Sequence, residues 1–193
     1  MTDPPSVEAI VMGASAGAIE TLGAILPRLP ADFPVPILAV VHIPRSQDSL
    51  LANLYRRRCQ MKICEAEDKL PIESGCVYFA PANYHLQVEW NRQISLSSED
   101  PVNFSRPSID ILFETAADVY AERLLGIVLT GANHDGAAGL QAIAQAGGQA
   151  IVQHPEEAIM PTMPLAAASA CPQAQVMKVH EMTWFLQNLA KPE

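Results

Sequence analysis

The chain has 193 residues, and 12 Lys or Arg against 21 Asp or Glu give it a formal net charge of −9. This length fits one domain, and with 49% hydrophobic and only 17% charged residues the chain can bury a sizeable core, which excludes general disorder. The acidic balance argues against nucleic acid and anionic membrane surfaces as main partners, because both attract basic surfaces.

Signals for membrane insertion and for export are missing from this sequence. The most apolar run, Val35 to Val41, is interrupted by Pro36 and is far shorter than the ~20 residues that a span requires. The segment Met1 to Pro5 carries an acid where a secretory signal carries basic residues, so we expect a cytoplasmic protein. The cysteines lack the spacing of a zinc site, so we expect no metal; they are Cys59, Cys64, Cys76 and Cys171. In a cytoplasmic protein we expect them to be reduced thiols. We also expect no cofactor.

The first part of the chain alternates between buried strands and helices. A strand over Ala9 to Gly13 leads through a small-residue turn into a helix over Ala18 to Leu29, which Pro30 ends. A second strand follows over Ile37 to His42, and Asp48 or Ser49 can cap the helix after it. This alternation is typical of βαβ units that build a parallel sheet.

The middle of the chain lacks the alternation of strands and helices. Short extended pieces are predicted there, with a hairpin turn at Trp90-Asn91-Arg92 and a polar loop over Ser97 to Arg106. Pro107 is predicted as the first position of a helix that reaches Tyr120. The alternation then resumes, with strands at Leu125 to Leu129, Gln149 to Gln153 and Gln175 to Val179, and helices at Gly136 to Ala146, Leu165 to Ala170 and Thr183 to Leu189. We therefore predict an α/β fold with a doubly wound, mostly parallel sheet flanked by helices and a β-hairpin insertion in the middle.

The turn after the first strand contains the first candidate for chemistry. Gly13-Ala14-Ser15-Ala16-Gly17 fits G-x-S-x-G, placed between a buried strand and a helix as this motif requires. Such a turn presents the serine hydroxyl, and free N–H groups at the helix start can stabilise an oxyanion. Two alternatives use the same residues: Ser15 as a simple N-cap, and the glycines as a dinucleotide site. The second is disfavoured, because the second strand ends in His42 rather than in an acid.

Two further polar residues follow core strands. His42 ends the second strand, and Asp135 lies in the loop after the strand Leu125 to Leu129. Alone, each fits a structural role, Asp135 as an N-cap above all. In a parallel sheet, however, both would project with Ser15 from one edge, where a nucleophile, a base and an orienting carboxylate could converge. A zinc-binding alternative fails, since His180-Glu181 is followed by Trp184 where H-E-x-x-H needs its second His.

From about Ile10 to Val179 the chain resembles the CheB-type chemotaxis protein-glutamate methylesterases. The similarity is carried by motifs in series, namely Gly13-Ala14-Ser15, His42-Ile43-Pro44, Ala80-Pro81 with Tyr84-His85, Arg106-Pro107-Ser108-Ile109-Asp110, Leu129-Thr130-Gly131 with Asp135-Gly136-Ala137-Ala138-Gly139, and Met163-Pro164. The resemblance implies that Ser15, His42 and Asp135 form a catalytic triad, with an oxyanion hole from the N–H groups of Ala16 and Ala132. It implies hydrolysis of glutamyl methyl esters on chemoreceptors with release of methanol, and deamidation of certain receptor glutamines.

This sequence departs from the family pattern in three places. Ala16 stands where Thr is usual, Gly17-Ala18 replaces a Gly pair, and Ala132-Asn133 replaces Met-Gly. The backbone donors survive these changes, because any residue other than Pro supplies an N–H. Asn133 is tolerable where Gly had a left-handed conformation, since Asn visits that conformation more readily than most residues.

The resemblance also sets expectations about domains and partners. Family members often carry an N-terminal receiver domain, but here the first strand begins by about Ala9, so we expect residues 1–193 to form a single, monomeric catalytic domain without a receiver. The expected partners are the cytoplasmic domain of a methyl-accepting chemoreceptor and a receptor methyltransferase. Arg106 is a candidate for bordering the site and meeting the acidic receptor. A non-catalytic receptor-docking adaptor and a small-molecule esterase are alternatives on the same fold.

Overall fold

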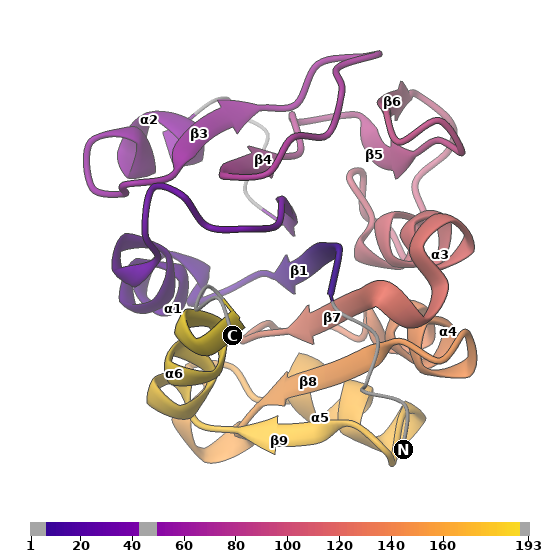
Figure 1. Cartoon of the computed structure of the whole chain (residues 1–193). Helices are drawn as coiled ribbons and strands as arrows, with labels where there is room; N and C mark the ends of the chain where they lie inside the picture. Colours follow the sequence, from indigo (N-terminus) through magenta and orange to yellow (C-terminus); the bar gives the residue numbers. More distant parts are fainter. Residues whose placement is uncertain (1–6, 43–49, 190–193) are drawn as a thin grey trace, which may run out of the picture.

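The computed structural model describes residues 7–42 and 50–189. Its centre is a parallel sheet of seven strands (Figure 1), which confirms the predicted fold class. From edge to edge the strands are β3 (Lys62–Glu65), β4 (Cys76–Phe79), β2 (Ile37–Val41), β1 (Ala9–Ala14), β7 (Leu124–Val128), β8 (Gln149–Gln153) and β9 (Gln175–Met177). From β1 the chain adds β2 on one side, where β4 is inserted between β2 and the edge strand β3, and then adds β7, β8 and β9 in order on the other side. Such an order leaves a crevice at the carboxyl ends of the central strands, where ligands bind in open α/β sheets.

Helices cover both faces of this sheet (Figure 1). One face carries α1 (Ala18–Ile25), α2 (Leu50–Arg56) and α6 (Val179–Leu189), and the other carries α3 (Ile109–Tyr120), α4 (Ala137–Gln145) and α5 (Thr162–Ala170). The period of two along β1 divides its side chains between two cores, since Ile10 and Met12 join the first and Ala9 and Val11 the second. Burial on both faces explains why the central strands are continuous apolar runs.

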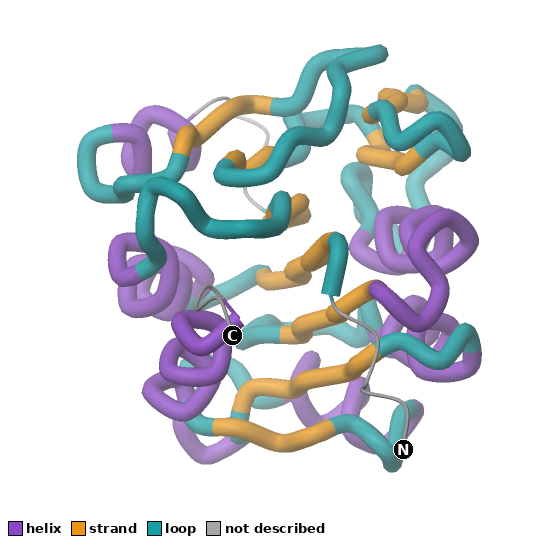
Figure 2. The backbone as a smooth tube through the Cα atoms, in the orientation of Figure 1, coloured by secondary structure: helices purple, strands orange, loops and turns teal. Residues whose placement is uncertain are grey.

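The predicted hairpin insertion is present. β5 (His85–Val88) and β6 (Ile94–Ser97) pair in antiparallel register and form a separate two-stranded sheet (Figure 2). The insertion packs against α3, where the Thr115 hydroxyl accepts a hydrogen bond from the Val88 N–H at 3.2 Å. The hairpin therefore supports the middle of the helix whose N-terminus borders the candidate site.

Four helix boundaries differ from the predictions. The helices predicted from Leu165 and from Thr183 begin earlier, at Thr162 and at Val179, and the last strand accordingly ends at Met177 rather than at Val179. The first helix ends at Ile25 and continues as a short 3₁₀ segment, Leu26–Arg28, because Pro27 has no N–H for an α-helical hydrogen bond. The helix predicted from Pro107 begins at Ile109, since Ser108 is an N-cap with extended backbone. The predicted cap at Asp48 or Ser49 lies outside the described residues. Within residues 7–42 and 50–189, none of the helices has the length and apolar character needed to cross a membrane.

Candidate active site

Ser15 lies directly after β1, in the turn that leads into α1. The N-cap of α1 is Gly17, whose φ of 87° lies in the left-handed region, and no side chain caps this helix. The alternative that Ser15 is only an N-cap is therefore wrong. Ser15 is half-buried, and no hydrogen bond among the described residues uses its hydroxyl. The side chain is thus free to take part in chemistry.

The loop after β7 holds this turn through Thr130. The Thr130 carbonyl accepts a hydrogen bond from the Ser15 N–H at 2.9 Å, and the Thr130 hydroxyl donates to the Ala16 carbonyl at 2.8 Å. The same hydroxyl accepts from the Met160 N–H at 2.9 Å, and the Thr130 N–H donates to Gln153 Oε1 at 2.8 Å. Because Thr130 is fully buried, these bonds fix where the peptide groups on both sides of Ser15 point.

Two exposed residues, Ala16 and Ala132, could supply backbone N–H groups to a substrate at Ser15. Ala16 follows it in sequence, and Ala132 belongs to the loop that Thr130 anchors. In the part of the chain that the structure describes, no hydrogen bond uses the N–H of either residue. Gly131 permits the close approach of the two loops, since a Cβ there would collide with Met163 and lie 3.0 Å from the Ser15 Cβ. Free donors beside a serine are what an oxyanion hole requires.

His42 and Asp135 form a hydrogen-bonded pair next to this turn. The register of β1 with β2 pairs Ala14 with Val41, and the His42 N–H donates to the Ala14 carbonyl at 3.0 Å, so His42 lies beside the residue before Ser15. The distance from His42 Nε2 to Asp135 Oδ2 is 2.9 Å. The imidazole is 14% exposed and the Asp135 side chain is completely buried. This pair occurs at the edge where the sequence predicted it.

The carboxylate of Asp135 lies at the N-terminus of α3. Oδ2 accepts the Ile109 N–H at 2.7 Å, and Oδ1 accepts the Asp110 N–H at 3.1 Å and the Ser108 hydroxyl at 2.9 Å. Burial alone would raise the pKa of Asp135, but the bond from His42 and the bonds from the Ile109 and Asp110 N–H groups outweigh it, so this pKa is lowered from its usual value. The free donors of a helix start thus keep the carboxylate ionised.

Asp110 of α3 binds the N-terminus of the next helix, α4, in the same way that Asp135 binds the N-terminus of α3. Its Oδ1 accepts the N–H groups of Gly136 at 2.9 Å and Gly139 at 2.7 Å, which begin α4. Asp135, two residues before α4, therefore binds the start of α3, and Asp110 of α3 binds the start of α4. Burial raises the pKa of Asp110, the nearby charge of Asp135 adds to this rise, and the two glycine N–H groups oppose it.

Several supporting residues were missed in the sequence analysis. Ser108 and Asp110 were quoted only as parts of a motif, and Asn103 was assigned to a loop, although its Nδ2 donates to Asp110 Oδ2 at 2.8 Å and to Asp135 Oδ1 at 3.3 Å. The pattern Ser108-Ile109-Asp110 is a helix start and could have indicated capping, but not its partner. His85 Nδ1 accepts the Ser108 N–H at 3.1 Å and so holds the same segment from the hairpin.

Two expectations about individual residues need comment. Arg106 Nη1 donates to the carbonyls of Ser98 at 2.7 Å and Glu99 at 2.9 Å, so its guanidinium fastens its own loop, and no described hydrogen bond joins it to the His42–Asp135 pair. Asn133 is not among the described non-glycine residues with positive φ, so its place in the loop does not depend on tolerance of a left-handed backbone. Its side chain instead forms hydrogen bonds within the site.

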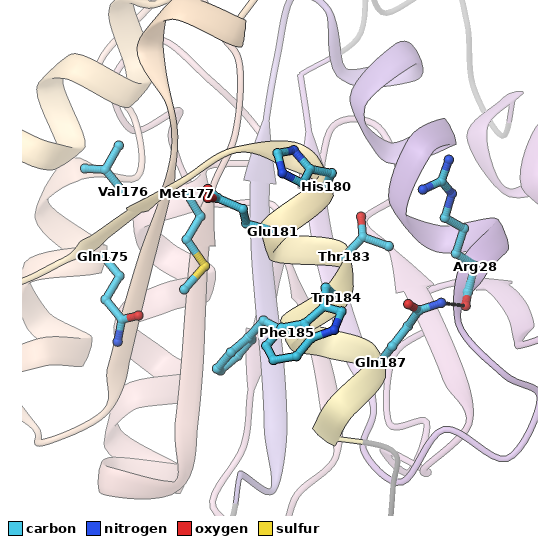
Figure 3. Close-up of a pocket in the computed structure, with 10 residues that line it drawn as sticks. All are labelled: Arg28, Gln175, Val176, Met177, His180, Glu181, Thr183, Trp184, Phe185 and Gln187. Carbon is cyan, nitrogen blue, oxygen red and sulfur yellow. Dashed lines mark hydrogen bonds between the residues drawn. The ribbon is translucent and has the colours of Figure 1, made fainter.

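A separate hollow of about 660 Å³ is lined by residues of β9 and α6 and by Arg28 (Figure 3). Exposed Val176 and Trp184 contribute to its lining, together with Met177 and His180, and a hydrogen bond from Gln187 to the Arg28 carbonyl closes one side at 2.9 Å. It contains neither Ser15, His42 nor Asp135. The chemistry-bearing residues are therefore gathered at the strand ends, away from this hollow.

Comparisons with known proteins agree with this geometry. The family model described as CheB methylesterase matches residues 10–186. A Leptospira interrogans protein named "Putative protein-glutamate methylesterase/protein-glutamine glutaminase" is 47% identical over 175 residues, which cover 91% of each chain. A Symbiobacterium thermophilum protein named "Protein-glutamate methylesterase/protein-glutamine glutaminase" is 34% identical over 173 residues, which are 90% of this chain and 48% of that one.

A solved structure gives the same result for the fold. The crystal structure of the Thermotoga maritima CheB methylesterase catalytic domain superimposes with a TM-score of 0.89 at 29% identity, over 96% of this chain and 100% of that one. The family model and the structural match both extend over nearly the whole chain, and the hydroxyl, the histidine–carboxylate pair and the free N–H groups are the parts of an acyl-transfer site. The chain belongs to the CheB methylesterase family.

Proposed function

We propose that this chain is a serine hydrolase that demethylates glutamyl methyl esters on chemoreceptors, with Ser15 as nucleophile, His42 as general base and acid, and Asp135 as the orienting carboxylate. The observation that carries the proposal is the 2.9 Å contact from His42 Nε2 to Asp135 Oδ2 at the strand ends that flank the Ser15 turn. The names of the relatives from Leptospira interrogans and Symbiobacterium thermophilum support the same reaction.

The two ring nitrogens of His42 have exchanged roles relative to the common serine-protease arrangement. There the carboxylate binds Nδ1 and the hydroxyl binds Nε2. Here Asp135 holds Nε2, so Nδ1 is the nitrogen left for the Ser15 proton. Because an ionised carboxylate only accepts hydrogen bonds, Nε2 carries the proton of the neutral ring and Nδ1 carries the lone pair.

The proposed reaction has two steps. Ser15 Oγ attacks the ester carbonyl as His42 Nδ1 takes the hydroxyl proton, and the negative oxygen of the tetrahedral intermediate is held by the N–H groups of Ala16 and Ala132. The proton passes to the methoxy oxygen, and methanol leaves. Water then attacks the acyl-enzyme by the same route and releases glutamate and Ser15. A primary amide fits the same site and would release ammonia, which accounts for glutaminase activity.

Methanol release from a methylated chemoreceptor cytoplasmic fragment tests the proposal. The wild type should release methanol, and Ser15→Ala and His42→Ala should each lower the rate by about a thousandfold or more. A folded wild type that binds the fragment and releases nothing would favour the adaptor instead. Equal hydrolysis of simple esters and receptor esters would favour a small-molecule esterase. A cytoplasmic location, a monomeric state, a single domain without a receiver and binding to a receptor methyltransferase stay predictions.

A further inference from the structure

Both ring nitrogens of His42 are hydrogen-bonded, and neither bond involves Ser15. Nε2 contacts Asp135 Oδ2 at 2.9 Å, and Nδ1 lies 3.1 Å from Nδ2 of Asn133. Within the described residues the Ser15 hydroxyl has no hydrogen-bond partner. The nitrogen that the proposed reaction needs for the Ser15 proton is therefore occupied by the side chain of a different residue.

The orientation of the Asn133 amide decides the direction of this contact. Its Oδ1 accepts the backbone N–H of Asp135 at 3.0 Å. A reversed amide would set its NH₂ group against that N–H, two donors facing each other, so the NH₂ group faces His42. Asn133 therefore donates to Nδ1, and the lone pair of the proposed base is engaged.

We propose that Asn133 is a positioning residue which holds the Nδ1 lone pair of His42 in the resting enzyme, so that Ser15 must displace its amide before it is activated. The inference rests on the proposed function, because it takes Ser15 as the nucleophile. The amide enforces the correct tautomer, since Nδ1 cannot carry a proton against an N–H donor. It also competes with the hydroxyl for the same lone pair.

The surroundings allow the amide to move. Asn133 is half-buried, and its neighbours Ala132 and His134 are exposed, so a new side-chain rotamer has solvent to enter. Its backbone is not left-handed, so other residues fit there without strain. A neutral hydrogen bond of this kind shifts an equilibrium by only about three- to tenfold, which a bound substrate can overcome.

The substitution Asn133→Ser distinguishes competition for His42 Nδ1 from the hydrogen bond by which Asn133 supports its loop. In Asn133→Ser the hydroxyl can still accept the Asp135 N–H two residues on, but it is too short to occupy Nδ1. We expect a fluorophosphonate probe to label Ser15 about three- to tenfold faster in this variant than in the wild type. Asn133→Asp is the matched control, because its carboxylate also accepts the Asp135 N–H but favours a proton on Nδ1, and its labelling should fall at least about tenfold.

The outcomes distinguish the two proposals. Faster labelling of Asn133→Ser together with slower labelling of Asn133→Asp supports competition. Slower or unchanged labelling of Asn133→Ser, in a wild type that is labelled, overturns the role of Asn133 and leaves the proposed function standing. No labelling of any of these proteins, with Ser15→Ala as the blank, rejects the activated serine itself and the competition with it.

A spectroscopic measurement tests the contact independently of activity. In protein with ¹⁵N-labelled histidine, the ring signals of His42 are identified by their loss in His42→Gln. The wild type should show an unprotonated Nδ1 and a protonated Nε2, and Asn133→Ser should shift the Nδ1 signal while Nε2 stays protonated. A protonated Nδ1 in the wild type, or an Nδ1 signal that Asn133→Ser leaves in place, overturns the inference.

Discussion

The two sides of the candidate site are held in different ways. On one side, the Asp135 carboxylate accepts hydrogen bonds from His42, from the start of α3 and from Asn103. On the other, the Ser15 turn is fastened by the backbone and the Thr130 hydroxyl, and neither the Ser15 hydroxyl nor the N–H groups of Ala16 and Ala132 have a partner in the described chain. The difference is that between an orienting group, which must not move, and groups that must be free to meet a substrate.

Truncation of Asp135 should destabilise the fold strongly, and truncation of Ser15 should hardly change its stability. Asp135→Ala leaves several buried donors without an acceptor, so we expect the free energy of unfolding to fall by about 3 to 5 kcal/mol. Ser15→Ala removes a hydroxyl without a described partner and should change it by less than about 0.5 kcal/mol. Urea unfolding followed by circular dichroism measures both, while methanol release should be lost in both.

Equal destabilisation by the two substitutions would contradict this comparison. A second control is Asp135→Asn, which keeps one acceptor oxygen and should recover part of the lost stability without restoring activity, because the amide would place a donor against the start of α3 or against His42.

The Thr130 hydroxyl tests how firmly the nucleophile turn is held. Thr130→Val leaves the Ala16 carbonyl without its donor and the Met160 N–H without its acceptor. We expect the free energy of unfolding to fall by about 1 to 2 kcal/mol and kcat to fall by about tenfold. Thr130→Ser keeps the hydroxyl and should keep both quantities near the wild type. A loss of stability with kcat unchanged would indicate that the turn holds its geometry without Thr130.

The stabilising contribution of the Asp135 carboxylate should decrease gradually as the pH falls. Because the pKa of Asp135 is lower in the folded chain than in the unfolded chain, its ionised form stabilises the fold above the unfolded value of about 3.9, and this contribution is lost as the pH falls through the folded pKa. The difference in unfolding free energy between the wild type and Asp135→Asn should therefore be largest near neutral pH and should narrow below about pH 4. Urea titrations of both proteins at several pH values measure this difference. A difference that increases in acid would contradict a lowered pKa of Asp135.

The fold and the convergence at the strand ends could be predicted from local pattern. The strands β1, β2 and β7 are buried apolar runs, and each is followed by a polar residue of the site; in a parallel sheet these strand ends share one edge. The hairpin was also predicted, because a short polar turn at Trp90-Asn91-Arg92 separates two extended pieces.

The supporting contacts could not be predicted, because they depend on docking between helices that are far apart in the sequence. Asp110 and Gly139 are 29 positions apart, and nothing local to either indicates the 2.7 Å bond between them. The contact of Asn133 with His42 depends on the rotamer of an amide, which is set by the Asp135 N–H in the folded loop. The late start of α3 depends on the extended Ser108, whose N–H is taken by His85.

The hydrogen bond from the Gly136 N–H to Asp110 also affects the chemical stability of the Asp135-Gly136 peptide bond. Asp-Gly is a dipeptide prone to isomerisation, since glycine leaves its nitrogen unhindered for attack on the aspartyl side-chain carbonyl. Here the Gly136 nitrogen donates its proton to Asp110 Oδ1 at 2.9 Å, and the Asp135 carboxylate faces the start of α3 instead. Both reacting groups are thus held in hydrogen bonds to other residues, so we expect isomerisation at Asp135 to be slow for as long as α3 and α4 stay docked.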